Sequence, residues 1–283
     1  MSSTSIDVRA SDDIQTPLAL DLEKIKRTTA ELTGEVPLPD GTSIYRRATW
    51  RERKVIREYL SQTIKSTGLE PQIHEYRKFG ENVYGMLPAT QSSPSTETVV
   101  IGAHFDSYPG RGAIDNATSV ALTLELARTL KTIDCRNRNL LFVFFDEEET
   151  GIVGSRMFAK TIPDKLNLKI HSAHTMDEIG WDSDNDRAVE LELPSQKLRA
   201  LYSQYADLLK IPLLFNDSEM SDHASFRSIG IDSVGITDEF ESGDDHYPYA
   251  HTRADSYSKV NFTHVDSTGK LILAVLEELL SCN

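Results

Sequence analysis

Histidine and carboxylate side chains follow apolar runs at several points in this sequence of 283 residues. His104 and Asp106 come directly after TVVIGA, and the acidic run DEEE at 146–149 comes directly after LLFVFF. Asp177 follows a further apolar segment, and Asp115 begins an amphipathic stretch. Carboxylates gathered in one place repel one another unless a cation lies among them. Imidazole and carboxylate ligands without thiolates suit zinc, so these residues predict a divalent metal site.

The elements that must position these residues form a regular pattern. Two helical patterns and three extended segments come first, at 20–33, 48–67, 70–77, 82–87 and 98–103. Apolar strands then alternate with amphipathic helices up to a closing helix over 264–280. Near-continuous apolar strands flanked by helices are typical of a sheet that is covered on both faces. The sequence predicts an α/β fold, a three-layer α/β/α sandwich with a mixed, mostly parallel central sheet and a site at the carboxyl ends of its strands.

The predicted sandwich occupies nearly the whole chain. Residues 19–283 are expected to form a single catalytic domain, because no linker and no internal repeat divides them. The Ser-, Thr- and Asp-rich segment 1–18 is expected to be a flexible tail. Residues near 181–194 and near 214–220 are expected to form loops that line the substrate pocket.

The composition is acidic, with 30 Lys and Arg against 44 Asp and Glu and a formal net charge of −14. Such a surface repels phosphates and anionic lipids, which argues against nucleic-acid and membrane partners. The N-terminal segment lacks the basic and apolar regions of an export signal, so we expect a cytoplasmic protein, or a secreted one if a leader has been removed. Cys135 and Cys282 are expected to be reduced thiols. The oligomeric state has no signal in the sequence.

Six motifs appear in the order and approximate spacing of one family: GAHFDS, GAIDNATS, FFDEEETGIVGS, TMDEIG, SDHASF and YAHTRAD. Over residues 70–282 the chain resembles the co-catalytic dinuclear zinc aminopeptidases. Their clan also includes glutamate carboxypeptidase and glutaminyl cyclase. The resemblance implies a fold of the zinc-exopeptidase type and an enzyme that hydrolyses peptides.

The resemblance also implies a set of metal ligands for two Zn²⁺ ions. His104 of GAHFDS and Asp177 of TMDEIG match the ligands of one zinc, whereas Glu149 of the acidic run and His251 of YAHTRAD match those of the other. Asp115 of GAIDN matches the bridging carboxylate. An aspartate suits this role physically, since its two oxygens can bridge metal ions about 3.5–4 Å apart.

Three further residues are candidates for catalytic roles. Glu148 matches the general base of the family, which takes a proton from a metal-bridging water and passes it to the leaving amine. Asp106 is placed to accept a hydrogen bond from the imidazole of His104 and fix its tautomer. Several relatives carry a tyrosine directly before the last ligand, where this chain has Ala250. Tyr249 is therefore the candidate oxyanion donor, with a packing tyrosine as the equal alternative.

The leading functional hypothesis is an aminopeptidase that removes N-terminal residues from peptides. The alternatives are a glutaminyl cyclase, a carboxypeptidase of the same clan and, last, an inactive binding protein. The compact EETGIVGS favours a peptidase over a cyclase. An aminopeptidase needs carboxylates for the substrate ammonium, and the candidates are Glu178, Glu241, Asp244 and Asp245. A carboxypeptidase needs a cation, for which Arg111 and Arg253 are the candidates.

Overall fold

The computed structural model describes residues 18–93 and 96–282. The tail predicted over residues 1–18 lies outside these residues except for Leu18, which packs against the core. Within the described residues, no helix combines the length and the apolar character needed to cross a membrane.

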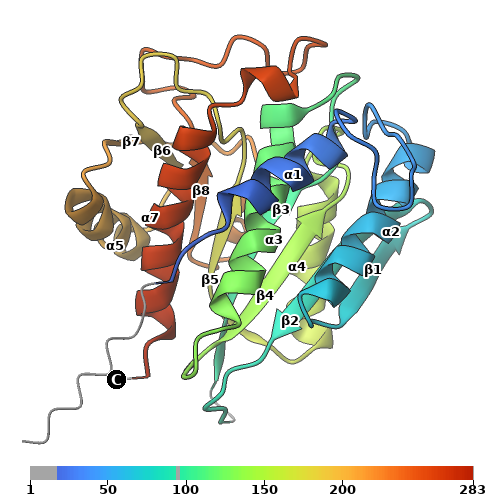
Figure 1. Ribbon diagram of the computed structural model, residues 1–283. Helices are drawn as coiled ribbons and strands as arrows, with labels where there is room; N and C mark the ends of the chain where they lie inside the picture. The colour runs from blue at the N-terminus through green and yellow to red at the C-terminus, as the bar shows by residue number, and fades with distance from the viewer. Residues whose placement is uncertain (1–17, 94–95, 283) are drawn as a thin grey trace, which may run out of the picture.

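A single mixed sheet of eight strands runs through the centre of the molecule (Figure 1), in the order β1-β2-β4-β3-β5-β8-β6-β7. The four central strands, β4, β3, β5 and β8, are parallel to one another, while β1, β2 and the β6–β7 pair are joined to them by antiparallel pairing. The predicted mixed, mostly parallel sheet is thus confirmed. The strands are Pro71–Arg77, Gly80–Leu87, Glu97–His104, Asn139–Phe145, Lys169–Met176, Val189–Glu192, Leu213–Asn216 and Ser233–Thr237, from β1 to β8.

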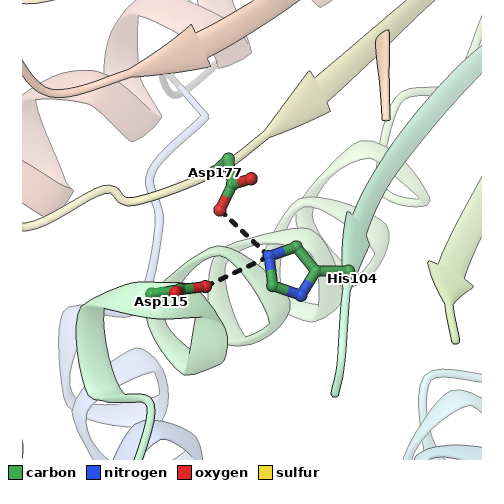
Figure 2. Close-up of side chains that lie close together, drawn as sticks. All are labelled: His104, Asp115 and Asp177. Carbon is green, nitrogen blue, oxygen red and sulfur yellow. Dashed lines mark hydrogen bonds and ion pairs between the residues drawn. The ribbon is translucent and has the colours of Figure 1, made fainter. Parts of the chain in front are cut away.

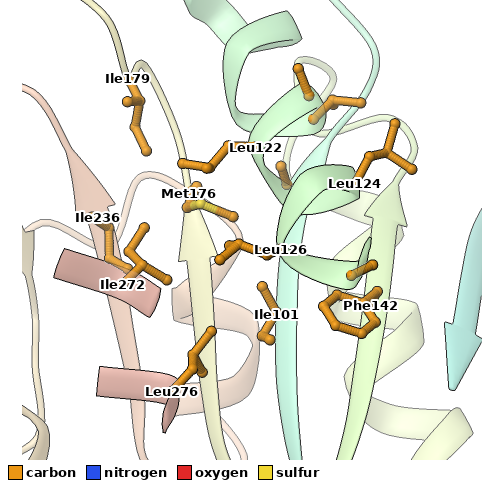
Figure 3. Close-up of a cluster of buried hydrophobic side chains, with 14 of the residues drawn as sticks. Ile101, Leu122, Leu124, Leu126, Phe142, Met176, Ile179, Ile236, Ile272 and Leu276 are labelled. Carbon is orange, nitrogen blue, oxygen red and sulfur yellow. The ribbon is translucent and has the colours of Figure 1, made fainter. Parts of the chain in front are cut away.

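Helices cover both faces of this sheet, as the three-layer prediction requires. The helices are Leu22–Leu32, Trp50–Ser66, Thr118–Leu130, Val153–Lys165, Gln196–Leu209, His223–Arg227 and Phe262–Leu280, from α1 to α7. The larger apolar cluster joins one face of the sheet to α1, α2, α3, α5 and α7. The smaller cluster joins the other face to α4 and α6. Figure 3 shows the larger cluster, in which Leu122 and Leu126 of α3 and Ile272 and Leu276 of α7 lie over the strands.

The sequence of each helix end explains where several helices begin. Asp21, Thr49, Ser195 and Asn261 each accept a hydrogen bond from a backbone N–H of the first turn of the helix that follows. Such caps satisfy donors that have no partner inside the helix. At Thr49 the cap is reciprocal, because the side chain of Glu52 accepts a hydrogen bond from the Thr49 N–H. The observed helices therefore begin close to their predicted starts.

Strand β6 corrects the prediction of a loop over 181–194. Its residues pair with β8 on one side and with β7 on the other. The alternation VELE suggests a segment with one solvated face, yet all four residues are buried. Glu190 is accommodated because it accepts hydrogen bonds from Asn216 Nδ2 at 2.7 Å and from two backbone N–H groups, of Phe240 and Glu241. Long-range partners of this kind leave no trace in the local sequence.

The prediction of two reduced thiols is wrong, because Cys135 and Cys282 form a disulfide with a Cα–Cα distance of 6.0 Å. The cysteines are 147 residues apart in the sequence. The turn between α3 and β4 and the segment after α7 meet at the edge of the sheet where β4 begins. There Asn137 N–H donates to Leu280 O at 3.1 Å. Disulfides are typical of oxidising compartments, so the cysteines no longer support the predicted cytoplasmic location.

Candidate metal centre

The predicted ligands come together at the carboxyl ends of the central strands. His104 is the last residue of β3, and Asp177 directly follows β5. Glu149 lies in the loop after β4, and Asp115 lies in the turn Ala113–Ala117 before α3, where Asp115 and Asn116 have non-helical backbone angles. His251 comes from the long segment between β8 and α7. Because parallel strands end at one edge of a sheet, residues up to 147 positions apart meet here.

The first group of ligands surrounds the Nε2 atom of His104 (Figure 2). This nitrogen lies 3.2 Å from Asp115 Oδ1 and 3.0 Å from Asp177 Oδ1. The ring is buried, and Asp115 is buried beside it. Ser221 Oγ donates to the second oxygen of Asp177 at 2.7 Å, which fixes the orientation of that carboxylate.

The second group surrounds the Nε2 atom of His251. This nitrogen lies 3.1 Å from Glu149 Oε2 and 3.4 Å from Asp115 Oδ2. In each group the potential ligand atoms all lie within 4.8 Å of one another. The two oxygens of Asp115 therefore face different groups, Oδ1 toward His104 and Oδ2 toward His251.

The chemistry of these two groups fits a pair of zinc ions. Each has one imidazole nitrogen and two carboxylates, without thiolates, and one carboxylate is common to both. The Oε2 atom of Glu149 is buried and lies 3.1 Å from His251 Nε2, without the geometry of a hydrogen bond. Burial raises the pKa of this carboxyl against the lowering effect of His251, and it also raises the pKa of Glu148. Neighbouring carboxylates raise both pKa values further, so the site favours a cation.

Asp106 supports two parts of the site at once. Its Oδ1 lies 3.4 Å from Nδ1 of His104, on the side of the ring away from the ligand groups. Its two oxygens also accept the backbone N–H groups of Glu148, at 3.0 Å, and of Glu149, at 3.2 Å. The hydrogen bond predicted between this imidazole and Asp106 is here a 3.4 Å contact without hydrogen-bond geometry, and the contacts of Asp106 with the acidic loop have no signal in the sequence. Asp106 thus links the end of β3 to the end of β4.

The four acidic residues after β4 divide into two pairs, one that contacts arginines and one that lines the cavity. Asp146 lies 2.6 Å from Arg53 Nε and 3.0 Å from Arg57 NH1, both in α2. Glu147 lies 3.0 Å from Arg53 NH2 and 2.8 Å from Arg77 Nε. These arginines offset the negative charges of Asp146 and Glu147. Glu148 and Glu149 instead line the cavity at the metal centre.

Two residues outside the predicted set hold the loop that carries Asp115. Asp255 accepts hydrogen bonds from the backbone N–H groups of Ile114, at 2.9 Å, and of Asp115, at 3.1 Å. The peptide bond between Asp115 and Asn116 is cis, and Asn116 Nδ2 donates to Met176 O at 2.9 Å. Asp255 ends the YAHTRAD motif, which is the only signal that pointed toward it in the sequence.

Arg47 is fully buried and has no counterpart among the predicted site residues. Its guanidinium donates to four backbone carbonyls: to Phe105 at 2.7 Å, Leu32 at 2.9 Å, Arg111 at 2.7 Å and Gly112 at 2.8 Å. Gly112 has a φ of +60°, and a Cβ at this position would lie 2.6 Å from Arg47 NH2. The arginine therefore joins the end of α1 to both ends of the loop between β3 and α3.

The tyrosines near His251 belong to an aromatic cluster. The ring of Tyr249 packs against Trp181 and Tyr247, with centroid distances of 5.7 and 5.8 Å, and Lys259 Nζ lies 4.4 Å from its centre. Among the described residues that line the cavity at the metal centre, Tyr249 does not appear. The geometry thus favours the packing alternative for this residue over an oxyanion donor.

The cavity at the metal centre has a volume of about 580 Å³. Besides ligands and Glu148, it is lined by three glutamates and by small or apolar residues: Glu178, Glu192, Glu219, Gly151, Ile152, Met220, Ser221, Thr237, Phe240 and Ala250. Of the candidate carboxylates for a substrate ammonium, Glu178 is in this set. Neither Arg111 nor Arg253 is among the described lining residues, and Arg111 NH1 donates to Thr33 O at 2.7 Å instead.

Comparison with known proteins settles the family. The model of peptidase family M28 matches residues 82–276, well over half of the chain. The chain belongs to peptidase family M28. The resemblance seen in the six motifs is thereby confirmed.

One curated relative and two solved structures show what this chain is similar to. Aminopeptidase YwaD of Bacillus subtilis is 27% identical over 204 residues, which cover 70% of this chain and 44% of the relative. The structure of BSAP, a zinc aminopeptidase from Bacillus subtilis, has a TM-score of 0.82 at 14% identity and covers 94% of this chain and 97% of the other. The glutaminyl cyclase of Porphyromonas gingivalis has a TM-score of 0.76 at 17% identity and covers 93% and 100%.

The M28 chain spans only part of the curated relatives that it matches, between 25% and 65% of their length in the cases considered. The two structural neighbours are below 25% identity and establish the fold alone. The family match begins at residue 82, so Arg47 and the arginines of α2 lie before it. In this M28 chain the segment before the matched region thus supplies buried contacts to the loops that hold the metal centre.

Proposed function

We propose that this chain is a zinc-dependent aminopeptidase that holds two Zn²⁺ ions bridged by Asp115. The observation that carries the proposal is the pair of ligand groups that share Asp115, one oxygen toward each group. His104 and Asp177 would complete the site of one ion, and Glu149 and His251 the site of the other. When bound, zinc would lower the pKa of a coordinated water to about 7 and polarise the substrate carbonyl.

Glu148 is the residue we assign to proton transfer. Its carboxyl group lines the cavity beside both ligand groups, and its main-chain N–H is held by Asp106. It would accept the proton of the attacking water and donate it to the leaving amine, which restores the carboxylate at the end of the reaction. Asp106 would act as a positioning residue, since it contacts His104 and the backbone of the acidic loop and does not line the cavity.

The charges around the cavity favour action at the amino end of a peptide. Glu178 is 9% exposed, lines the cavity and has a buried Oε2 atom without a hydrogen-bond partner. A substrate ammonium would satisfy that oxygen. A carboxypeptidase would need a cation near the same place, whereas Arg111 is bonded elsewhere. The partners we propose are therefore peptides with a free N-terminus.

The deciding experiment compares a set of aminoacyl p-nitroanilides with their N-acetylated counterparts and with an N-terminal glutaminyl peptide. Zinc-loaded protein is assayed with and without a chelator, and its metal content is measured. Chelator-sensitive release from free-amine substrates alone would support the proposal. Turnover of acetylated substrates, or ammonia release from the glutaminyl peptide alone, would overturn it.

Glu148→Gln tests the base directly. The variant should bind zinc as the wild type does and lose at least 100-fold in kcat, which is the size of a general-base contribution. Glu241→Gln is the matched control, because Glu241 is exposed and outside the described lining of the cavity. Retained activity in Glu148→Gln would remove this residue from the mechanism.

We further propose that the protein works in an oxidising compartment, on the strength of the Cys135–Cys282 disulfide. Protein isolated from its native source without reductant should have no free thiol that reacts with an alkylating reagent. Two reactive thiols would instead support the cytoplasmic expectation.

A further inference from the structure

The cavity at the metal centre is lined by more carboxyl groups than an aminopeptidase needs to hold the ammonium group of its substrate. Beyond the ligands and Glu148, its lining includes Glu178, Glu192 and Glu219, and among the described lining residues there is no Lys or Arg. One carboxylate suffices for the α-ammonium of a substrate. Glu178 is suited to that group, since it directly follows the ligand Asp177.

Glu192 is the buried member of the two remaining glutamates. It is the last residue of β6 and is 4% exposed, whereas Glu219 is exposed. The neighbouring strand β8 has a glycine, Gly235, beside the Glu192 carboxyl group. A Cβ at Gly235 would lie 2.6 Å from Glu192 Oε2, so the glycine leaves room for this carboxyl group. A carboxylate that is held in a buried wall of a cavity loses its hydration and favours a cation as its partner.

The nearest imidazole does not supply that cation. His223 Nδ1 lies 3.5 Å from Glu192 Oε2 and has no hydrogen-bond partner. Its Nε2 lies 2.8 Å from Ser218 O, which fixes the tautomer with the proton on Nε2. Burial lowers the pKa of His223, so the ring is neutral. Burial raises the pKa of Glu192 to about 8, the charges of Asp177 and Glu190 add to this effect, and a hydrogen bond with Ser218 opposes it.

The other walls of the cavity suit the aliphatic part of a long side chain. Ile152, Met220 and Phe240 line it together with Glu192. Lysine and arginine side chains pack their methylene stems along apolar surface and extend their charged group to a polar partner. These apolar side chains, together with the buried carboxyl group of Glu192, offer both kinds of contact.

We propose that this cavity receives the side chain of a lysine or arginine at the N-terminus of the peptide, with Glu192 as the residue that recognises its charge. This inference rests on the proposed aminopeptidase function and names the substrate class of the same site. Glu219, at the solvent-exposed part of the lining, adds to the negative field and makes a weaker contribution because water screens it.

The test compares lysine with norleucine, which has the same stem and lacks the ammonium group. Initial rates are measured for the p-nitroanilides of both on zinc-loaded protein. We expect kcat/KM for lysine to exceed that for norleucine by at least about tenfold, the discrimination that one charge-assisted hydrogen bond provides. Glu192→Gln should reduce this ratio to near one, because the neutral amide cannot pair with the ammonium group. Glu219→Gln should change the ratio by no more than about threefold.

Each outcome bears on a distinct claim. Turnover of norleucine at least equal to that of lysine would overturn the specificity and leave the aminopeptidase standing. If no substrate is turned over, the proposed function fails, and calorimetric titration of the zinc-loaded protein with lysine amide and norleucine amide still tests the cavity. Tighter binding of lysine amide that depends on Glu192 would support the inference. Equal binding would overturn it, and thermal melting of Glu192→Gln verifies that the variant is folded.

Discussion

Replacing Arg47 by methionine should strongly destabilise the protein, although this residue does not line the cavity. Methionine fills a similar volume and cannot donate a hydrogen bond. The substitution removes the side-chain donor of four carbonyls: those of Phe105, Leu32, Arg111 and Gly112. The Gly112 carbonyl keeps the N–H of Ala117 as a donor at 3.1 Å, so three acceptors, one of them partly buried, lose their partner. Each such loss costs about 1 kcal/mol, so the free energy of unfolding should fall by about 3 kcal/mol.

This loss is a large fraction of the stability of an ordinary domain, which is about 5–15 kcal/mol. Urea denaturation of zinc-free protein, followed by circular dichroism, measures it without interference from metal binding. Zinc affinity should fall as well, because the arginine holds both ends of the loop that leads to Asp115. Isothermal titration with zinc measures that second effect.

Arg46 provides the matched control. It is the preceding residue, with a half-exposed side chain whose Nε lies 2.6 Å from Glu52. Arg46→Met should cost no more than about 1 kcal/mol, the usual upper value for an exposed ion pair. If Arg47→Met also loses less than about 1 kcal/mol, or if the two variants cannot be distinguished, the reasoning about the buried carbonyls is refuted.

Three further predictions concern the metal, the disulfide and a buried histidine. His251→Ala should lower the zinc content from two ions per chain toward one, measured by elemental analysis; an unchanged content would remove it from the ligands. The double variant Cys135→Ser/Cys282→Ser should have a free energy of unfolding lower by up to about 5 kcal/mol, since the bond closes a loop of 147 residues. Its activity at low temperature should match that of the wild type, and a loss of activity there would contradict a purely structural role for the disulfide. Burial lowers the pKa of His174 to about 3, although Tyr202 contacts its Nδ1 at 2.9 Å. The unfolded state binds this proton below pH ~6.5, so the contribution of His174 to the free energy of unfolding is complete above that pH. It falls by up to about 1.4 kcal/mol per pH unit toward pH 4. In urea melts, the free energy of unfolding of His174→Gln should depend less steeply on pH than that of the wild type, and an equal dependence would contradict this.

The sequence predicts the parts of this molecule that depend on local pattern. Apolar runs such as LLFVFF mark the buried parallel strands, and capping residues such as Thr49 mark helix starts. Since parallel strands end at one edge, the residues that follow them must meet, so His104 and Asp177 could be brought together before any coordinates were known.

What the sequence does not predict depends on contacts between distant segments. Glu190 resembles a residue of the solvated half of an edge strand, and only its partners on other segments explain its burial. Arg47 stands in an undistinguished stretch, TSIYRRATW, where nothing separates it from its exposed neighbour. Likewise, the spacing of Cys135 and Cys282 cannot indicate that two chain segments lie at the same edge of the sheet.

The acidic run after β4 illustrates the limit most clearly. Four successive carboxylates have the same local character, and a family motif was needed to separate Glu148 and Glu149 from the two residues before them. In the structure the separation has a physical cause, because α2 and β1 present arginines to Asp146 and Glu147 alone.

The Cys135–Cys282 bond makes residues 135–282 a covalent ring. Glu149, Asp177 and His251 belong to this ring, whereas the other two candidate ligands stand outside it. Exposed residues around 241–246 offer a protease a point of attack inside the ring. A single cut there would open the ring without releasing a fragment, so the piece that carries His251 would stay tethered beside its partners at high effective concentration. Such a nick would be visible on an electrophoresis gel only after reduction.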